Sequence, residues 1–205
     1  MLPFIVDLPP MEQERVVCAI SAAVKYEIPA NIVLAVAEKE GGKPGQWVRN
    51  TNGTHDVGPM QFNTAYLGDL ARYGITADDV AAAGCYSYDL AAWRLRGHIL
   101  NDSGDIWTRA ANYHSRTPRF NAIYRADLMQ KAGQWAAWLD EHFVTRDVLE
   151  EGGQPVTTAQ RPAQPVQTRA AQPVQERAAA AQGATLTGYV PRRISFRTES
   201  EGSGQ

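Results

Sequence analysis

The chain lacks the features that mark several large protein classes. It has two cysteines and four histidines in 205 residues, which excludes a disulfide-rich small protein and a four-thiolate zinc site. The histidines share no metal-ligand spacing with one another or with the cysteines, so we expect no metal site. No run of 18 apolar residues is present, and we therefore expect no membrane-spanning helix. The net charge of -2 gives no electrostatic reason to expect a nucleic acid partner.

The aromatic residues are distributed unevenly along the chain. All five tryptophans lie before residue 140, and after Phe143 the only aromatic residues are Tyr189 and Phe196. Residues 163–178 form an imperfect Gln/Pro/Ala-rich repeat, and such a tract buries too little apolar surface to offset the entropy of ordering its backbone. We predict a folded domain over residues 1–145 and a flexible tail over residues 146–205.

The folded part is expected to be mainly helical. An apolar stripe predicts a helix over residues 11–26, and residues 31–40 are apolar nearly all round, which is typical of a buried central helix. Asn31 is the expected N-cap of that helix, and Gly41 its expected end. A capping-box pattern at Thr76 to Asp79 predicts a short helix that ends at Gly84. Further helices are expected over residues 88–100, 104–113 and 118–142, the last with an apolar set comprising Ile123, Leu128, Met129, Trp135, Trp138 and Leu139.

One stretch, residues 47–63, interrupts the helical pattern. Asn52 and Gly53 form a strong tight-turn signal between two short extended arms. The predicted architecture is therefore a helical domain with one small β-hairpin that follows the buried helix.

Two carboxyl groups are expected to lie near the junction of this helix and hairpin. Glu40 ends an otherwise apolar helix, where burial raises the pKa of a carboxyl group and allows it to donate a proton near neutral pH. Asp56 lies in a polar arm of the hairpin and is expected to remain ionised. Two carboxyl groups in contrasting environments are the pattern used for glycosidic bond cleavage. Glu38 is a poorer candidate for the acid, because it points to another side of the helix.

The residues around this pair resemble the lysozyme-like superfamily. The resemblance rests on Glu40–Gly42, on the run from Asn50 to Asn63 (NTNGTHDVGPMQFN) and on Ala110–Ser115 (AANYHS). Residues 10–142 as a whole are similar to the VirB1-like lytic transglycosylases of conjugation and type IV secretion systems. The sequence departs from the family pattern at Gly41, where serine is usual, and at His114, where asparagine is usual.

The resemblance implies a role for each matching residue. Glu40 matches the catalytic acid. Asp56 matches the lysozyme carboxylate that stabilises or attacks the oxocarbenium ion, although a purely structural turn role is the alternative. The expected substrate-binding residues are Met60, Gln61, Asn63, Tyr113 and His114. Tyr113 matches the aromatic residue that holds the catalytic acid or the sugar. The alternatives are core packing for Met60 and Tyr113 and a hydrogen bond within the hairpin for Gln61.

The implied function is cleavage of the β-1,4 bond between N-acetylmuramic acid and N-acetylglucosamine in peptidoglycan, without a metal or organic cofactor. The alternatives are a hydrolytic muramidase and a non-catalytic glycan-binding assembly module. The expected partners are the glycan strands and, through the tail, a secretion or conjugation apparatus. The expected location is the periplasm or cell envelope, although the first residues make a poor secretory signal.

The two cysteines leave two possibilities open. In an oxidising periplasm, Cys18 and Cys85 would pair and stabilise the fold by about 4 kcal/mol through loop closure. The alternative is two separate buried thiols.

Overall fold

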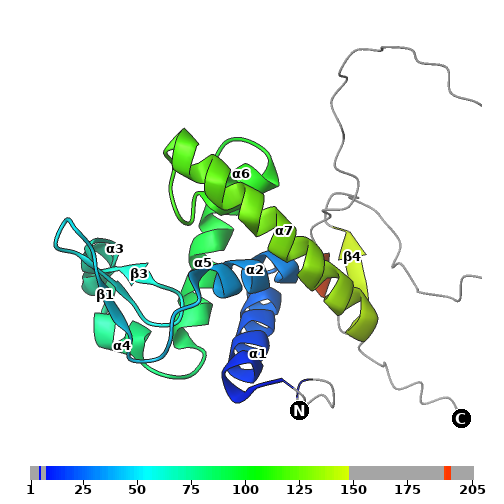
Figure 1. Ribbon diagram of the computed structural model, residues 1–205, viewed down its shortest axis with the longest axis horizontal. Coiled ribbons are helices and arrows are strands. Elements are labelled where there is room, and N and C mark those ends of the chain that lie inside the picture. Colours follow the sequence, from blue (N-terminus) through cyan, green and yellow to red (C-terminus); the bar gives the residue numbers. More distant parts are fainter. Residues whose placement is uncertain (1–4, 6–7, 148–191, 195–205) are drawn as a thin grey trace, which may run out of the picture.

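The structure is a computed structural model that describes residue 5, residues 8–147 and residues 192–194. The described chain is mainly helical and carries a small antiparallel sheet (Figure 1). The predicted fold class is confirmed. The longer helices are α1 (Pro10–Lys25), α2 (Ala30–Glu40), α5 (Tyr86–Asn101) and α7 (Pro118–His142), and the shorter ones are α3 (Thr64–Leu70), η2 (Ala71–Tyr73), α4 (Ala77–Ala81) and α6 (Ile106–Ala111). The strands are β1 (Trp47–Arg49), β2 (His55–Val57), β3 (Phe62–Asn63), β4 (Thr145–Asp147) and β5 (Arg192–Ile194).

Helix α2 forms the centre of the core, as its apolar sequence predicts. Residues 30–37 are all buried, and the helix packs against α1 and α7. The predicted N-cap is wrong, because α2 begins at Ala30 with Pro29 as its N-cap. Asn31 lies inside the helix, where its buried amide donates a hydrogen bond to the carbonyl oxygen of Ala132 in α7. Its polar group therefore joins two helices instead of starting one.

The predicted hairpin is part of a three-stranded sheet in the order β1-β2-β3. The turn at Asn52 and Gly53 is exposed, as expected, and Gly53 has a positive φ of 84°. The third strand forms because buried Phe62 pairs with buried Val57, which anchors the chain after the hairpin. Figure 1 shows this sheet with α3 and α4 on one side of the molecule and α7 on the other, with α2 and α5 between them.

Helix α7 lies along the core through one buried stripe. Its buried residues recur every three or four positions, the spacing of one helix face, and they are Asn121, Tyr124, Leu128, Ala132, Ala136 and Leu139. Ile123 was expected in this apolar set, but it lies off the stripe and is 63% exposed. The expectation for Ile123 is therefore wrong.

A disulfide joins Cys18 in α1 to Cys85, the residue before α5. The bond resolves the two possibilities that the sequence left open, and it closes a loop between positions 67 residues apart. It ties α1 to α5, two helices that also pack against each other.

The end of the described chain returns to the helical domain. Strand β5 pairs antiparallel with β4, and Ile194 is buried in the core cluster. The predicted tail therefore contributes at least one core side chain. The rest of the tail prediction concerns residues 148–191 and 195–205, which lie outside the described residues. Within the described chain, no helix combines the length and the apolar character that crossing a membrane requires.

Candidate active site

The junction between α2 and the sheet depends on two glycines. Gly41 ends α2 in the left-handed conformation with a φ of 57°. A Cβ atom at Gly42 would lie 2.2 Å from the carbonyl oxygen of Gly58 and 2.6 Å from Nε2 of Gln61. The glycine pair therefore lets the turn after β2 approach the end of α2, where Glu40 is the last residue.

Glu40 has the electrostatic properties of an acid that works near neutral pH. Burial raises the pKa of its carboxyl group to about 7. The hydroxyl of Tyr124 in α7 donates a 2.6 Å hydrogen bond to Oε1 of Glu40, and this bond lowers the pKa in part. The negative charge of Asp56 acts in the opposite direction and raises it. Near pH 7, a substantial fraction of Glu40 is therefore protonated and able to donate a proton.

Asp56 is held in place by the neighbouring strand. It lies on β2 directly opposite Asn63 on β3. The Asn63 amide donates hydrogen bonds of 2.9 Å to Oδ1 of Asp56 and to Oγ1 of Thr54, while Oδ1 of Asn63 accepts from the backbone N–H of Ala65 at the start of α3. Asn63, predicted to bind substrate, is thus a residue that orients Asp56 and caps α3.

The tyrosine that contacts Glu40 is not the one expected from the sequence. Tyr113 is 4% exposed, and its hydroxyl donates a 2.9 Å hydrogen bond to the carbonyl oxygen of Met60. Its side chain cannot stack on a sugar from this buried position, so the substrate-binding prediction for Tyr113 is corrected. The direct contact with Glu40 is made by Tyr124, which lies on the buried stripe of α7.

Met60 and Gln61 form the turn between β2 and β3. The Met60 side chain is fully buried in the core, which corrects its predicted role in binding substrate. Gln61 has a φ of 48°, unusual for a residue other than glycine, and its side-chain amide donates a 2.8 Å hydrogen bond to the carbonyl oxygen of Gly58. The strained backbone of Gln61 is thus tied into the turn that packs against Gly42, and its predicted contact with substrate stays a prediction.

His114 lies beside the acid through a ring contact. Its exposed imidazole stacks on Tyr124, with ring centroids 4.8 Å apart and planes 4° from parallel. Partial burial and the nearby charge of Lys39 lower the pKa of His114, so the ring is mostly neutral at pH 7. A neutral, exposed ring in this position can take part in substrate binding, which remains the role that the sequence predicts.

Arg94 belongs to the site, although the sequence analysis did not single it out. Its guanidinium carbon lies 4.2 Å from the ring centroid of Tyr66 and 4.7 Å from that of Tyr113. Its positive charge also lowers the pKa of Glu40. No local pattern in α5 indicates this arrangement, because the rings come from α3 and from the segment after α6.

Glu38 has a structural role that separates it from Glu40. Its carboxylate accepts hydrogen bonds of 2.8 Å from Nζ of Lys131 and from Nε1 of Trp135, both in α7. These bonds join α2 to α7. Among the described residues, no cluster of three or more His, Cys, Asp or Glu side chains is arranged to hold a metal ion.

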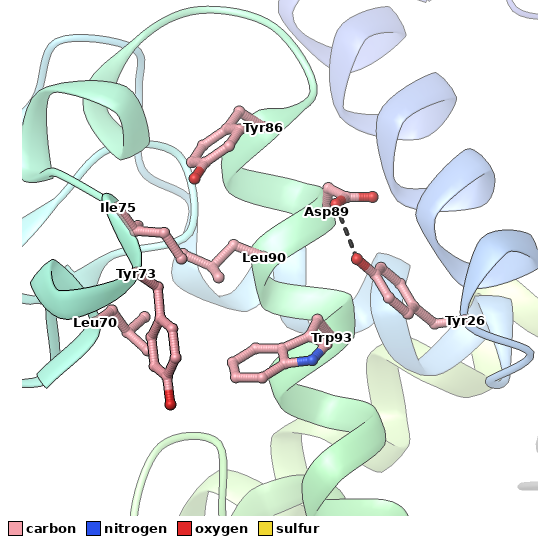
Figure 2. A pocket seen from close by; sticks show the side chains of 8 residues that line it. All are labelled: Tyr26, Leu70, Tyr73, Ile75, Tyr86, Asp89, Leu90 and Trp93. Atoms are coloured by element: carbon pink, nitrogen blue, oxygen red, sulfur yellow. Dashed lines mark hydrogen bonds between the residues drawn. The ribbon is translucent and has the colours of Figure 1, made fainter.

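Two hollows lie on either side of Trp93, which lines both. The first has a volume of about 290 Å³ and is mainly apolar (Figure 2). Its lining residues are Tyr26, Leu70, Tyr73, Ile75, Tyr86, Asp89, Leu90 and Trp93. The second has a volume of about 510 Å³ and includes Tyr66 and Arg94, so it adjoins the aromatic cluster beside Glu40.

Comparison with known proteins finds relatives in Shigella and Salmonella. Protein IpgF of Shigella flexneri is 31% identical over 104 residues, which cover 50% of this chain and 68% of that protein. Invasion protein IagB of Salmonella typhimurium is 26% identical over 101 residues, which cover 49% of this chain and 62% of that protein. No family model matches the chain. These relatives support the lysozyme-like resemblance, while their names identify no secretion system, so the VirB1-like group stays a prediction.

Proposed function

Because this chain belongs to the family of protein IpgF, we propose that it is an enzyme of the cell wall, a peptidoglycan lytic transglycosylase. The substrate is the β-1,4 bond between N-acetylmuramic acid and N-acetylglucosamine. The observation that carries the proposal is Glu40, a carboxyl group with its pKa raised to about 7 by burial and its Oε1 held by Tyr124.

The chemistry follows from the two protonation states of this one group. Protonated Glu40 donates its proton to the glycosidic oxygen as the bond to the muramyl C1 breaks, which leaves an oxocarbenium ion. The Glu40 carboxylate then takes the proton from the muramyl 6-hydroxyl while that oxygen attacks C1. The product is a 1,6-anhydro ring, and Glu40 is protonated again. A pKa near 7 suits a group that both gives and takes a proton.

The neighbouring residues orient Glu40 and stabilise the positive charge that develops on the sugar. The Tyr124 hydroxyl keeps Oε1 of Glu40 in one orientation, and the stacked ring of His114 covers one face of Tyr124. The charge of Asp56 stabilises the oxocarbenium ion, since a nearby anion favours developing positive charge. Asn63 holds Asp56 in place for this role.

A retaining muramidase is the second candidate, and the same pair of carboxyl groups supports it. The effect of Asp56 on the pKa of Glu40 requires the two charges to lie near each other. In that reaction Asp56 attacks or shields C1, and a water molecule completes hydrolysis to a reducing end. The two reactions differ in their products, so the products decide between them.

The location and partners belong to the same proposal. Peptidoglycan as a substrate places the enzyme in the periplasm or cell envelope. The name of IagB associates that relative with invasion. For this chain, we propose that it opens the wall for a secretion or conjugation apparatus. The predicted tail, residues 146–205, carries the Gln/Pro/Ala repeat and is the proposed contact with that apparatus.

Mass spectrometry of digested cell walls tests the function directly. We expect the full-length wild-type protein to release muropeptides with 1,6-anhydro ends and Glu40→Gln to release none, because glutamine keeps the shape but cannot donate the proton. Reducing ends would replace the transglycosylase by the muramidase. Cleavage by Glu40→Gln above about a hundredth of the wild-type rate would remove Glu40 as the acid.

A further inference from the structure

The second hollow is lined mainly by polar and charged residues, three of them arginines. We call it the arginine hollow, and its lining residues are Tyr66, Trp93, Arg94, Arg96, Gly97, His98, Asn101, Asp102 and Arg116. The α5 residues Arg94, His98 and Asn101 follow one another at intervals of four and three, which places them on the same helix face. Arg116 comes from the segment between α6 and α7.

Positive charge exceeds negative charge in this hollow. Asp102 is the one carboxylate in the lining, and it is already bound by Arg116 at 3.1 Å and by the amide of Asn112 at 2.8 Å. Within the described chain, neither Arg94 nor Arg96 forms an ion pair. Both arginines therefore line the hollow without an ion pair, although the Arg94 guanidinium also packs against the rings of Tyr66 and Tyr113.

His98 is held against Asp102 and adds no positive charge to the hollow. Its Nδ1 lies 2.7 Å from Oδ2 of Asp102, while its buried Nε2 has no hydrogen-bond partner among the described atoms. Burial lowers the pKa of His98, so at pH 7 the neutral ring donates from Nδ1 to Asp102 and carries a lone pair on Nε2. The Nε2 atom is enclosed in the protein, so it is not a contact for a ligand in the hollow.

Gly97 keeps the hollow open. It lies in α5 between Arg96 and His98, and no atom lies within 4 Å of the position that its Cβ would occupy. Glycine inside a helix costs about 1 kcal/mol relative to alanine. Its presence here leaves room for a ligand beside the arginines.

The neighbouring hollow in Figure 2 does not share these unpaired groups. Its one carboxylate, Asp89, already accepts hydrogen bonds from Lys25 and from the Tyr26 hydroxyl. The other lining residues are apolar or aromatic. Of these two hollows, the arginine hollow is the one that carries arginines without an ion pair.

We propose that the arginine hollow binds a carboxylate of the substrate, through Arg94 and Arg96. The location supports this, since Arg94 also lines the aromatic cluster beside Glu40 and its charge acts on Glu40. Only the identity of the ligand rests on the proposed function: peptidoglycan offers carboxylates in its stem peptides and, where the stem has been removed, on the lactyl group of the muramyl residue. Guanidinium groups bind carboxylates with paired hydrogen bonds, which makes them selective for this group.

An NMR titration of the full-length wild-type protein with small probes tests this directly. N-acetylmuramic acid carries the lactyl carboxylate, muramyl dipeptide carries a peptide carboxylate, and N-acetylglucosamine carries neither. We expect resonances of Arg96, Gly97 and His98 to shift with at least one acidic probe and not with the neutral sugar. The acidic probe that binds identifies which carboxylate is recognised.

Three variants show whether the binding depends on this hollow. Arg96→Gln should weaken binding of the acidic probe by about tenfold, the loss of one charge-assisted contact. Gly97→Leu should also weaken it, because it fills the hollow and leaves every charge in place. The control is Arg119→Gln, which removes an exposed arginine of α7 that lines neither hollow, and it should bind as wild type does.

The proposal is overturned if neither acidic probe shifts these resonances, if N-acetylglucosamine binds equally well, or if Arg96→Gln and Gly97→Leu both bind as the control does. None of the probes contains a glycosidic bond to cleave, so these results do not depend on catalysis. Digestion of cell walls measured in parallel reports the proposed activity separately.

Discussion

The hydroxyl of Tyr124 donates a 2.6 Å hydrogen bond to Oε1 of Glu40, although 84 residues separate the two in sequence. The bond crosses from α7 to the end of α2, the two helices that pack together in the centre of the core. It gives the acid a fixed orientation and moderates the rise in its pKa that burial causes. The acid therefore depends on a helix that no local sequence motif connects to it.

Replacing Tyr124 with phenylalanine should raise the pKa of Glu40 further, because the hydroxyl stabilises the ionised carboxylate. Cleavage requires protonated Glu40, so activity should fall as the pH rises through about 7 in the wild type and at a higher pH in Tyr124→Phe. The maximal rate should also drop by about tenfold or more, since the carboxyl group loses its orientation. Rates of wall digestion from pH 5 to 9 measure both effects, and an unchanged profile would show that the bond is incidental.

Removing the charge of Asp56 should have the opposite effect on the pH profile. The Asp56 charge raises the pKa of Glu40, so Asp56→Asn should move the loss of activity to a lower pH. The amide retains an oxygen that can accept from Asn63. A transglycosylase should keep producing 1,6-anhydro ends, at a reduced rate because the stabilising charge is lost. Complete loss of cleavage with normal folding would instead favour the muramidase.

Glu40 should also make the stability of the protein depend on pH. Its pKa rises from an ordinary 4.5 to about 7 on folding, so the folded state retains a proton that the unfolded chain releases. The resulting stabilisation is complete below pH 4.5 and is lost as the pH rises through 7. Glu40→Gln carries no charge, so its unfolding free energy relative to wild type should increase from near zero at pH 4 to as much as about 3 kcal/mol at pH 8.

The control for this measurement is Glu38→Gln on the same helix. Glu38 is bound by Lys131 and Trp135, and the variant should be less stable than wild type at pH 8. Chemical denaturation at several pH values measures both variants. If Glu40→Gln is less stable than wild type at pH 8, the carboxylate of Glu40 is well accommodated in the fold and its pKa is not raised.

Ending the chain after residue 147 should destabilise the domain. This truncation removes β5 and with it Ile194, which is 6% exposed. Burying one isoleucine contributes about 1.5–3 kcal/mol, so the thermal midpoint should fall by about 5 °C. Ile194→Ala in the full-length chain should reproduce part of the loss. A truncated protein that unfolds at the wild-type temperature would show that β5 adds nothing to stability.

Much of the architecture could be predicted from local sequence patterns. The apolar character of residues 31–40 identified the central helix, because a helix that is buried on every side has apolar residues on every side. The turn at Asn52 and Gly53 was recognisable because few residues adopt its backbone conformation. Glu40 was identifiable as the candidate acid because it is the last residue of an apolar helix and is followed by two glycines.

The wrong predictions concern contacts between residues far apart in the chain, which no local sequence pattern indicates. Asn31 has the residue type of an N-cap, but its amide reaches the carbonyl of Ala132 on another helix. Tyr113 lies in the motif that resembles the family pattern, yet its hydroxyl binds the Met60 carbonyl and leaves Glu40 to Tyr124. Ile194 follows a long stretch of low-complexity sequence and still packs into the core.

The sequence by itself determined most of the helices, the turn and the position of the candidate acid, because each depends on residues close together in the chain. Only the tertiary structure decided which groups surround that acid. Tyr124 and Arg94 come from α7 and α5, and Cys18 pairs with Cys85 across 67 residues. The pKa of Glu40 depends on burial and on charges brought near it by folding, and these are properties of position in space that residue type alone does not specify.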